Sequence, residues 1–152
     1  MDFATIKGDF KKRRLTMANE NKVFHDTVIS GIEYDGNALI MSASEAKYED
    51  AYGNCNIEIS VKEDDIAIRF VKQYPRLSNA RFKGREITFL QLKRLFSKGR
   101  SLMITELWRQ EDTETVVFEC VLMPFARGGG RCKKVFLELS DPGKIEIIEK
   151  TV

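Results

Sequence analysis

The stretch FHDTVISGIEYDGNALIMSASEA, residues 24–46, decides the fold class of this chain. Its two arms are rich in β-branched and aliphatic residues, and they flank Asp35-Gly36-Asn37. Asp-Gly pairs favour tight hairpin turns, because both residues tolerate the positive φ angles that such turns need. The stretch therefore predicts two antiparallel strands joined by a short turn.

Further strands are predicted along the chain. Residues 55–61 and 66–71 alternate apolar and polar side chains at period two, which puts one face of a strand in a core and the other in water. The acidic triplet 63–65 between them is expected to be a turn. Four more candidates with short connections are residues 101–109, 115–123, 134–140 and 144–150. Short connections indicate antiparallel neighbours in a meander.

One amphipathic helix is predicted at about residues 88–98, TFLQLKRLFSK. Thr88 and Gln91 have the spacing of a capping box at its start. An apolar stripe follows at helical period, and Gly99 suits the left-handed position that ends a helix. The expected fold is α+β and mostly β, with antiparallel hairpins and a meander that form a curved sheet or a small barrel. The helix would cover one opening or one face.

The length of 152 residues suits one domain. We expect that domain at residues 23–152, preceded by a basic segment, residues 1–22, that is either an arm or an extra hairpin. The N-terminus lacks the long apolar region of a secretory signal, and no apolar run approaches the ~18 residues of a membrane span. The three cysteines Cys55, Cys120 and Cys132 are far apart and odd in number, which favours a reducing, cytoplasmic location without disulfides.

The net charge of +2 is unevenly distributed. Residues 76–100 carry eight basic side chains and one acid, residues 7–14 carry five bases and one acid, and residues 127–134 carry four bases. If these segments converge in space, the molecule has a positive face that attracts nucleic acid or acidic proteins. The candidate partner-binding or anion-binding residues are Arg76, Arg81, Lys83, Arg85, Arg127, Arg131, Lys133 and Lys134. The segments 76–85 and 127–134 are predicted to lie on one side of the domain.

The stretch FARGGGRCKK, residues 125–134, has the glycines and bases of a phosphate-binding loop. A Walker A loop needs a Ser or Thr after Gly-Lys, and a dinucleotide-binding turn needs a following helix. Neither is present, because the next segment is predicted to be a strand. The stretch is therefore interpreted as a solvated hairpin tip, and contact of this tip with a phosphate or carboxylate partner is the alternative.

Two short patterns in the sequence resemble catalytic or metal-binding motifs, and each is incomplete or explained by local structure. His25-Asp26 resembles the pair found in metal-dependent phosphohydrolases, but those sites need several histidines and this chain has one. Asp35, Glu45 and Lys47 have the spacing of a Mg²⁺-dependent nuclease motif, in which the acids hold the metal. Asp35 is already explained by its turn, so an enzyme of this kind is a remote alternative. No catalytic residue, metal or cofactor is predicted.

Two tyrosines are candidate aromatic anchors for a partner. Tyr48 and Tyr52 lie in KYEDAYGN, residues 47–54, which is predicted to be a loop between strands. Aromatic residues on loops often anchor partner proteins. The alternative is that each ring covers the core.

Residues 23–45 resemble the opening of small β-rich bacterial immunity-type proteins. The resemblance rests on Phe24, His25 and Asp26, which begin a strand, followed by a turn and an aliphatic strand. It implies a non-enzymatic protein that binds and blocks another protein. The sequence as a whole predicts a small protein-binding module, inhibitor or immunity-like, whose basic surface engages another protein with an acidic or nucleic-acid-binding surface. A nucleic-acid-binding domain, single-stranded or duplex and without sequence preference, is the alternative.

Overall fold

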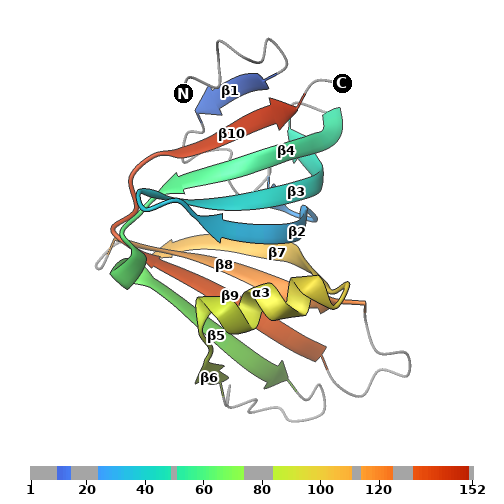
Figure 1. Cartoon of the computed structure of the whole chain (residues 1–152), viewed down its shortest axis with the longest axis vertical. Helices are drawn as coiled ribbons and strands as arrows, with labels where there is room; N and C mark the ends of the chain where they lie inside the picture. The colour runs from blue at the N-terminus through green and yellow to red at the C-terminus, as the bar shows by residue number, and fades with distance from the viewer. Residues whose placement is uncertain are drawn as a thin grey trace.

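The computed structural model describes residues 10–14, 24–48, 51–73, 84–110, 114–124 and 132–150. In these residues the chain forms one antiparallel sheet of ten strands and one α-helix (Figure 1). The strands are β1 (Phe10–Arg14), β2 (Val28–Tyr34), β3 (Ala38–Tyr48), β4 (Ala51–Ser60), β5 (Ile66–Gln73), β6 (Gly84–Glu86), β7 (Ser101–Gln110), β8 (Thr115–Met123), β9 (Cys132–Ser140) and β10 (Ile145–Lys150). The helix is α3 (Phe89–Ser97), and a 3-10 turn, η1 (Glu63–Asp65), precedes β5.

The strand order is β1-β10-β4-β3-β2-β7-β8-β9-β5-β6. In the described residues the edge strands β1 and β6 do not pair with each other, so the predicted curved sheet formed as an open sheet and not as a closed barrel. The mostly β class with one helix is confirmed. In the same residues no helix is long and apolar enough to span a membrane.

The sheet has a corner between β2 and β7. These strands share only the pairs Val28–Met103 and Ile29–Leu102, and then they diverge. Past this point α3 lies beside β2, and Lys93 Nζ on the helix is 3.9 Å from Glu33 Oε1 on the strand. Figure 1 draws the helix in front of the lower strands of the sheet, β9 and β5. We call β7, β8, β9, β5 and β6, with α3, the helix-bearing half.

One hydrophobic core joins both halves. Ile57 on β4 and Ile147 on β10 are fully buried in it, as are Phe118 on β8 and Leu137 on β9. The β8 strand is apolar on both faces, which is expected for a strand near the middle of a sheet. Phe118 packs edge-to-face on Phe24, with ring centroids 5.7 Å apart.

The hairpin that decides the fold class forms as predicted. The Asp35 carboxylate accepts hydrogen bonds from the backbone N–H groups of Asn37 at 2.8 Å and Ala38 at 2.7 Å. Gly36 adopts a φ of +98°, which a side chain would strain. The pairing of β2 with β3 follows on both sides of this turn.

The helix and its caps are also confirmed. The Gln91 backbone N–H donates to Thr88 Oγ1 at 3.1 Å, and the Thr88 N–H donates back to Gln91 Oε1 at 2.8 Å. Leu92 is buried, and the helix gives way to Gly99 at a φ of +79°. The sequence signals sufficed here because capping and amphipathicity are local.

Two expectations about local structure were wrong, and one short strand was missed. Phe24 does not begin a strand: residues 24–27 form a turn in which Asp26 has a φ of +67°. The predicted loop at residues 47–54 is instead the end of a long hairpin, in which Lys47 pairs with Tyr52 and Tyr48 with Ala51. The short edge strand β6 was not predicted, because three residues carry too little local pattern.

The described part of the basic N-terminal segment is β1. It pairs along its whole length with β10, from Phe10–Lys150 to Arg14–Glu146. This strand forms the edge of the sheet opposite to β6. The bases of residues 11–14 therefore lie on one edge strand, and Arg85 lies on the other, β6.

Candidate functional site

The helix-bearing half has one end at which basic segments meet. Ser101 on β7 pairs with Met123 on β8, and Gln73 on β5 pairs with Cys132 on β9. Strands β5 and β8 therefore end, and strands β7 and β9 begin, at the same end of the sheet. The C-terminus of α3 leads into β7 there. Figure 1 shows this end at the right, where β5 finishes and β9 begins. We call it the basic end.

Three of the candidate residues have described side chains at or near this end, and Arg85, which pairs with Phe70 about halfway along β5, is the farthest from it. Arg85 is exposed, and its guanidinium carbon lies 5.8 Å from the centroid of the Phe70 ring, which supports it from below. Lys133 is exposed. Lys134 is mostly buried, and its Nζ lies 3.5 Å from Glu119 Oε2, so part of its charge is neutralised within the protein. Arg85 and Lys133 are thus the better-presented cations.

Sequence reasoning missed two further bases at the basic end. Lys98 is exposed just after α3, and Arg100 donates from Nε to the Met123 carbonyl at 2.8 Å. Cations in this position face the negative end of the helix dipole. Their place in a charged run was visible in the sequence, but the hydrogen bond across the sheet that orients Arg100 was not.

Five candidate bases lie outside the described residues: Arg76, Arg81, Lys83, Arg127 and Arg131. The side chains of Tyr48 and Tyr52 are outside them too, although their backbones are in β3 and β4. The convergence of residues 76–85 with 127–134 therefore stays a prediction.

The opposite end of the same strands is acidic. Ile66 pairs with Leu139 and Thr115 with Ser140, so η1, Glu114 and Asp141 come together there. The Asp141 backbone N–H donates to the Glu114 carbonyl at 3.0 Å. The side-chain hydrogen bond and the negative charge of Asp141 raise the pKa of Glu114. We call this the acidic end.

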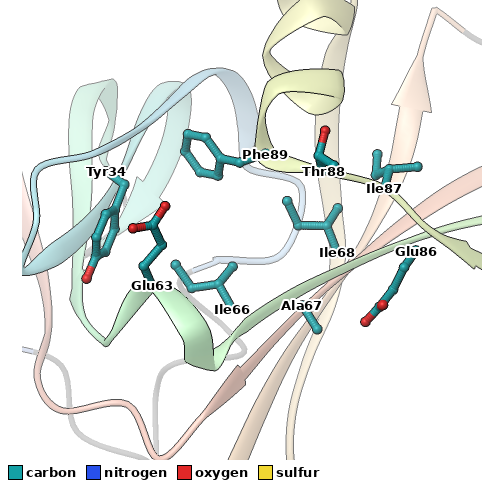
Figure 2. Close-up of a pocket in the computed structure, with 9 residues that line it drawn as sticks. All are labelled: Tyr34, Glu63, Ile66, Ala67, Ile68, Glu86, Ile87, Thr88 and Phe89. Atoms are coloured by element: carbon teal, nitrogen blue, oxygen red, sulfur yellow. The ribbon is translucent and has the colours of Figure 1, made fainter.

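A cavity of about 260 Å³ opens at the acidic end. Figure 2 shows its aromatic walls, Tyr34 from β2 and Phe89 from the first turn of α3. Ile66 and Ile68 of β5 form an aliphatic floor, and the Glu63 carboxylate points toward the two rings. Sequence reasoning did not single out this set, because it joins residues from four elements.

The residues considered for catalysis are separated or already bonded. Asp35 lies in its turn, whereas Glu45 lies far along β3, about 20 Å away at the rise of a strand. One Mg²⁺ ion cannot bridge that distance. His25 Nδ1 lies 3.1 Å from Asp26 Oδ2 in an exposed local pair. Within the described residues no group of three or more His, Cys, Asp or Glu side chains could hold a metal ion.

The described cysteines are buried. Cys55 and Cys120 are not joined in disulfides and have almost no exposed surface. Burial raises the pKa of Cys120 far above its ordinary value, so this thiol does not form the reactive thiolate. Both side chains act as small apolar core residues.

Comparison with known protein families, with curated proteins and with solved structures found no match to this chain.

Proposed function

We propose that this protein is a small non-enzymatic binding module that docks its basic end on an acidic surface of a partner protein. The observation that carries the proposal is the strand register at Gln73–Cys132 and Ser101–Met123. It puts the strand ends that flank residues 74–83 and 124–131, and the start of β7 after α3, at one end of the sheet. A concentrated positive surface raises the rate of encounter with an acidic partner.

The described side chains favour a protein partner over single-stranded nucleic acid. Non-specific binders of single strands stack bases on exposed aromatic rings. The aromatic side chains whose exposure the structure describes are each buried or half-buried, and the Phe70 ring lies against the Arg85 guanidinium. The resemblance to immunity-type proteins points to an inhibitor of another protein. Binding of duplex nucleic acid needs no stacking of bases on aromatic rings. Duplex nucleic acid is therefore the alternative ligand that an experiment must distinguish from an acidic protein.

The test compares two double variants of equal charge. Arg85→Glu with Lys133→Glu reverses two exposed bases at the basic end, and Lys62→Glu with Lys144→Glu reverses two exposed bases at the acidic end. Both change the net charge by the same amount, so only position differs. Binding is measured by fluorescence anisotropy with a labelled poly-glutamate peptide and with single-stranded and duplex DNA and RNA, at low and moderate salt.

We expect the peptide to bind, to weaken with salt, and to bind about tenfold less tightly to the basic-end variant, with little change in the acidic-end variant. Tighter binding to nucleic acid, with a steep salt dependence, would replace the proposal by the alternative. Equal losses in both variants, or no binding to any probe, would overturn the assignment of the basic end as a binding surface.

A further inference from the structure

The cavity between Tyr34 and Phe89 lies at the acidic end and shares no lining residue with the basic end. Its volume of about 260 Å³ is below the range of pockets that hold cofactors or drug-sized ligands. A space of this size suits one long side chain. Its occupant can be inferred from the chemistry of its walls.

The aromatic walls are held in place by bonds outside the cavity. Tyr34 donates its hydroxyl to the Val61 carbonyl at 2.8 Å, which fixes the ring against the chain before η1. Phe89 is the first residue of α3 and follows the N-cap residue Thr88. Both rings are half-buried, so their faces are partly available to a ligand. Such a prearranged pair loses little conformational entropy when a ligand enters.

The charge around the cavity is negative. Glu63 points its carboxylate between the two rings in Figure 2, and Asp64 and Asp65 follow it in η1. The Glu86 side chain also lines the cavity, but Figure 2 shows its carboxylate pointing away from the rings. Aromatic faces and carboxylates both attract cations, and they act in the same direction here.

Two described features favour an anion, the start of α3 and the exposed Lys62 that precedes Glu63, and together they are weaker than the three acids of η1. A helix N-terminus carries roughly half a positive charge, spread over its unpaired N–H groups. The capping box already engages the N–H groups of Thr88 and Gln91. The carboxylates of Glu63 and its neighbours in η1 outweigh what remains.

We propose that this cavity binds the side chain of a lysine presented by a partner protein. The ammonium group lies against the Tyr34 and Phe89 rings and the Glu63 carboxylate, and the alkyl chain lies on Ile66 and Ile68. Charge complementarity favours a basic segment of the partner over an acidic or neutral one. The domain then carries two binding sites of opposite preference, one at each end of the same strands.

The experiment uses the whole protein with ¹³C-labelled isoleucine methyl groups. The probe is an Ala-Lys-Ala peptide with blocked ends, and the matched neutral probe contains acetyl-lysine. We expect saturable shifts of the Ile66 and Ile68 methyl signals with the lysine peptide, at millimolar affinity, and none with the neutral one. Shifts of equal size with both peptides, or no shifts at all, would overturn the proposal.

Two carboxylate variants locate the cation. Glu63→Gln should weaken binding of the lysine peptide about three- to fivefold, because it removes the charge and keeps the shape. Glu86→Gln should leave binding nearly unchanged, although it removes the same charge from the same rim. Equal losses in the two variants would show a diffuse acidic field instead of a site. Methyl shifts that depend on protein concentration without peptide would identify a second copy of the chain as the occupant.

This result can be separated from that of the proposed function. The peptide test depends on the acidic end, and the poly-glutamate test depends on Arg85 and Lys133 at the other. Either can fail while the other succeeds.

Discussion

The basic end and the acidic end of the helix-bearing half differ in charge although the same strands carry both. At one end Arg85, Lys98 and Lys133 are exposed, and at the other Glu63, Glu114 and Asp141 are exposed. The difference comes from topology. In an antiparallel meander, successive connections fall alternately at the two ends of the strands. Charges that alternate from one connection to the next therefore become segregated in space.

The comparison also shows what keeps the ends apart. β5, β8 and β9 run from one end to the other, with buried residues along their whole length. Both ends of the helix-bearing half share this core. A change in the core should affect both ends together, whereas a change at one end should leave the other intact.

The largest expected effect tests that shared core. Phe118→Ala removes a fully buried ring from β8 and should lower the free energy of unfolding by about 3–5 kcal/mol. Urea denaturation is followed by the fluorescence of Trp108, near the acidic end, and by far-UV circular dichroism. Coincident transitions are expected for one cooperative unit. A loss below about 1 kcal/mol, or two separate transitions, would show that the ends do not depend on one core.

The second prediction concerns the turn that begins β3. Asp35→Ala removes an acceptor of two backbone hydrogen bonds and should cost about 1–2 kcal/mol near neutral pH. The same bonds hold the pKa of Asp35 below its ordinary value of 3.8. Its contribution to stability is therefore present above that pH and is lost as the pH falls through the lower, folded-state pKa.

The matched control for this turn is Asp64→Ala, an exposed acid in η1. It should change the free energy of unfolding by less than about 0.5 kcal/mol. Urea titrations from pH 7 to pH 3 test both variants. A cost of Asp35→Ala that stays constant over this range would contradict a role for the ionised carboxylate.

The third prediction compares the two ends of α3. Thr88→Ala removes the N-cap at the acidic end and should cost about 1 kcal/mol. Ser97→Ala, at the basic end, removes a bond from Ser97 Oγ to the Arg94 carbonyl at 2.8 Å and should cost less. Thermal unfolding monitored by circular dichroism ranks the two. Equal losses would show that capping does not distinguish these ends.

Local signals predicted most of the strands, the hairpin turn and the helix. Asp35-Gly36 and the Thr88–Gln91 pair specify their own hydrogen bonds within four residues, so no other part of the chain is needed. The predicted strand at residues 24–27 failed because Asp26 can adopt a positive φ and close a turn. The end of the β3–β4 hairpin was missed because its polar residues and Gly53 are typical of loops, and pairing across the hairpin overrides that preference.

The features that position the candidate sites are non-local. The pairing of β1 with β10 joins opposite ends of the sequence, and the corner between β2 and β7 depends on which strands meet. Tyr34 and Phe89 line one cavity from distant parts of the chain. The charged connections themselves were visible in the sequence. Assigning each to an end needed the strand order, which hydrophobic periodicity does not contain.

The smallest expected effect concerns like charges at the acidic end. Asp141 raises the pKa of Glu114, so the folded state binds a proton more tightly than the unfolded state. Repulsion between the two carboxylates then costs stability at neutral pH, and the cost disappears as the pH falls below about 4.5, the ordinary value for Glu114. Glu114→Gln should therefore raise the Tm slightly at pH 7 and leave it unchanged at pH 3.

Asp141→Asn tests the same pair from the other side. Asp141 has a φ of +47°, and asparagine tolerates this conformation, so the substitution changes charge without straining the backbone. Each single variant should give a similar gain in Tm at pH 7, and the double variant should gain little more, because one repulsion can be removed only once. Fully additive gains would instead mean that each carboxylate is repelled by the whole acidic end, which would make the charge of that end a collective property of its connections.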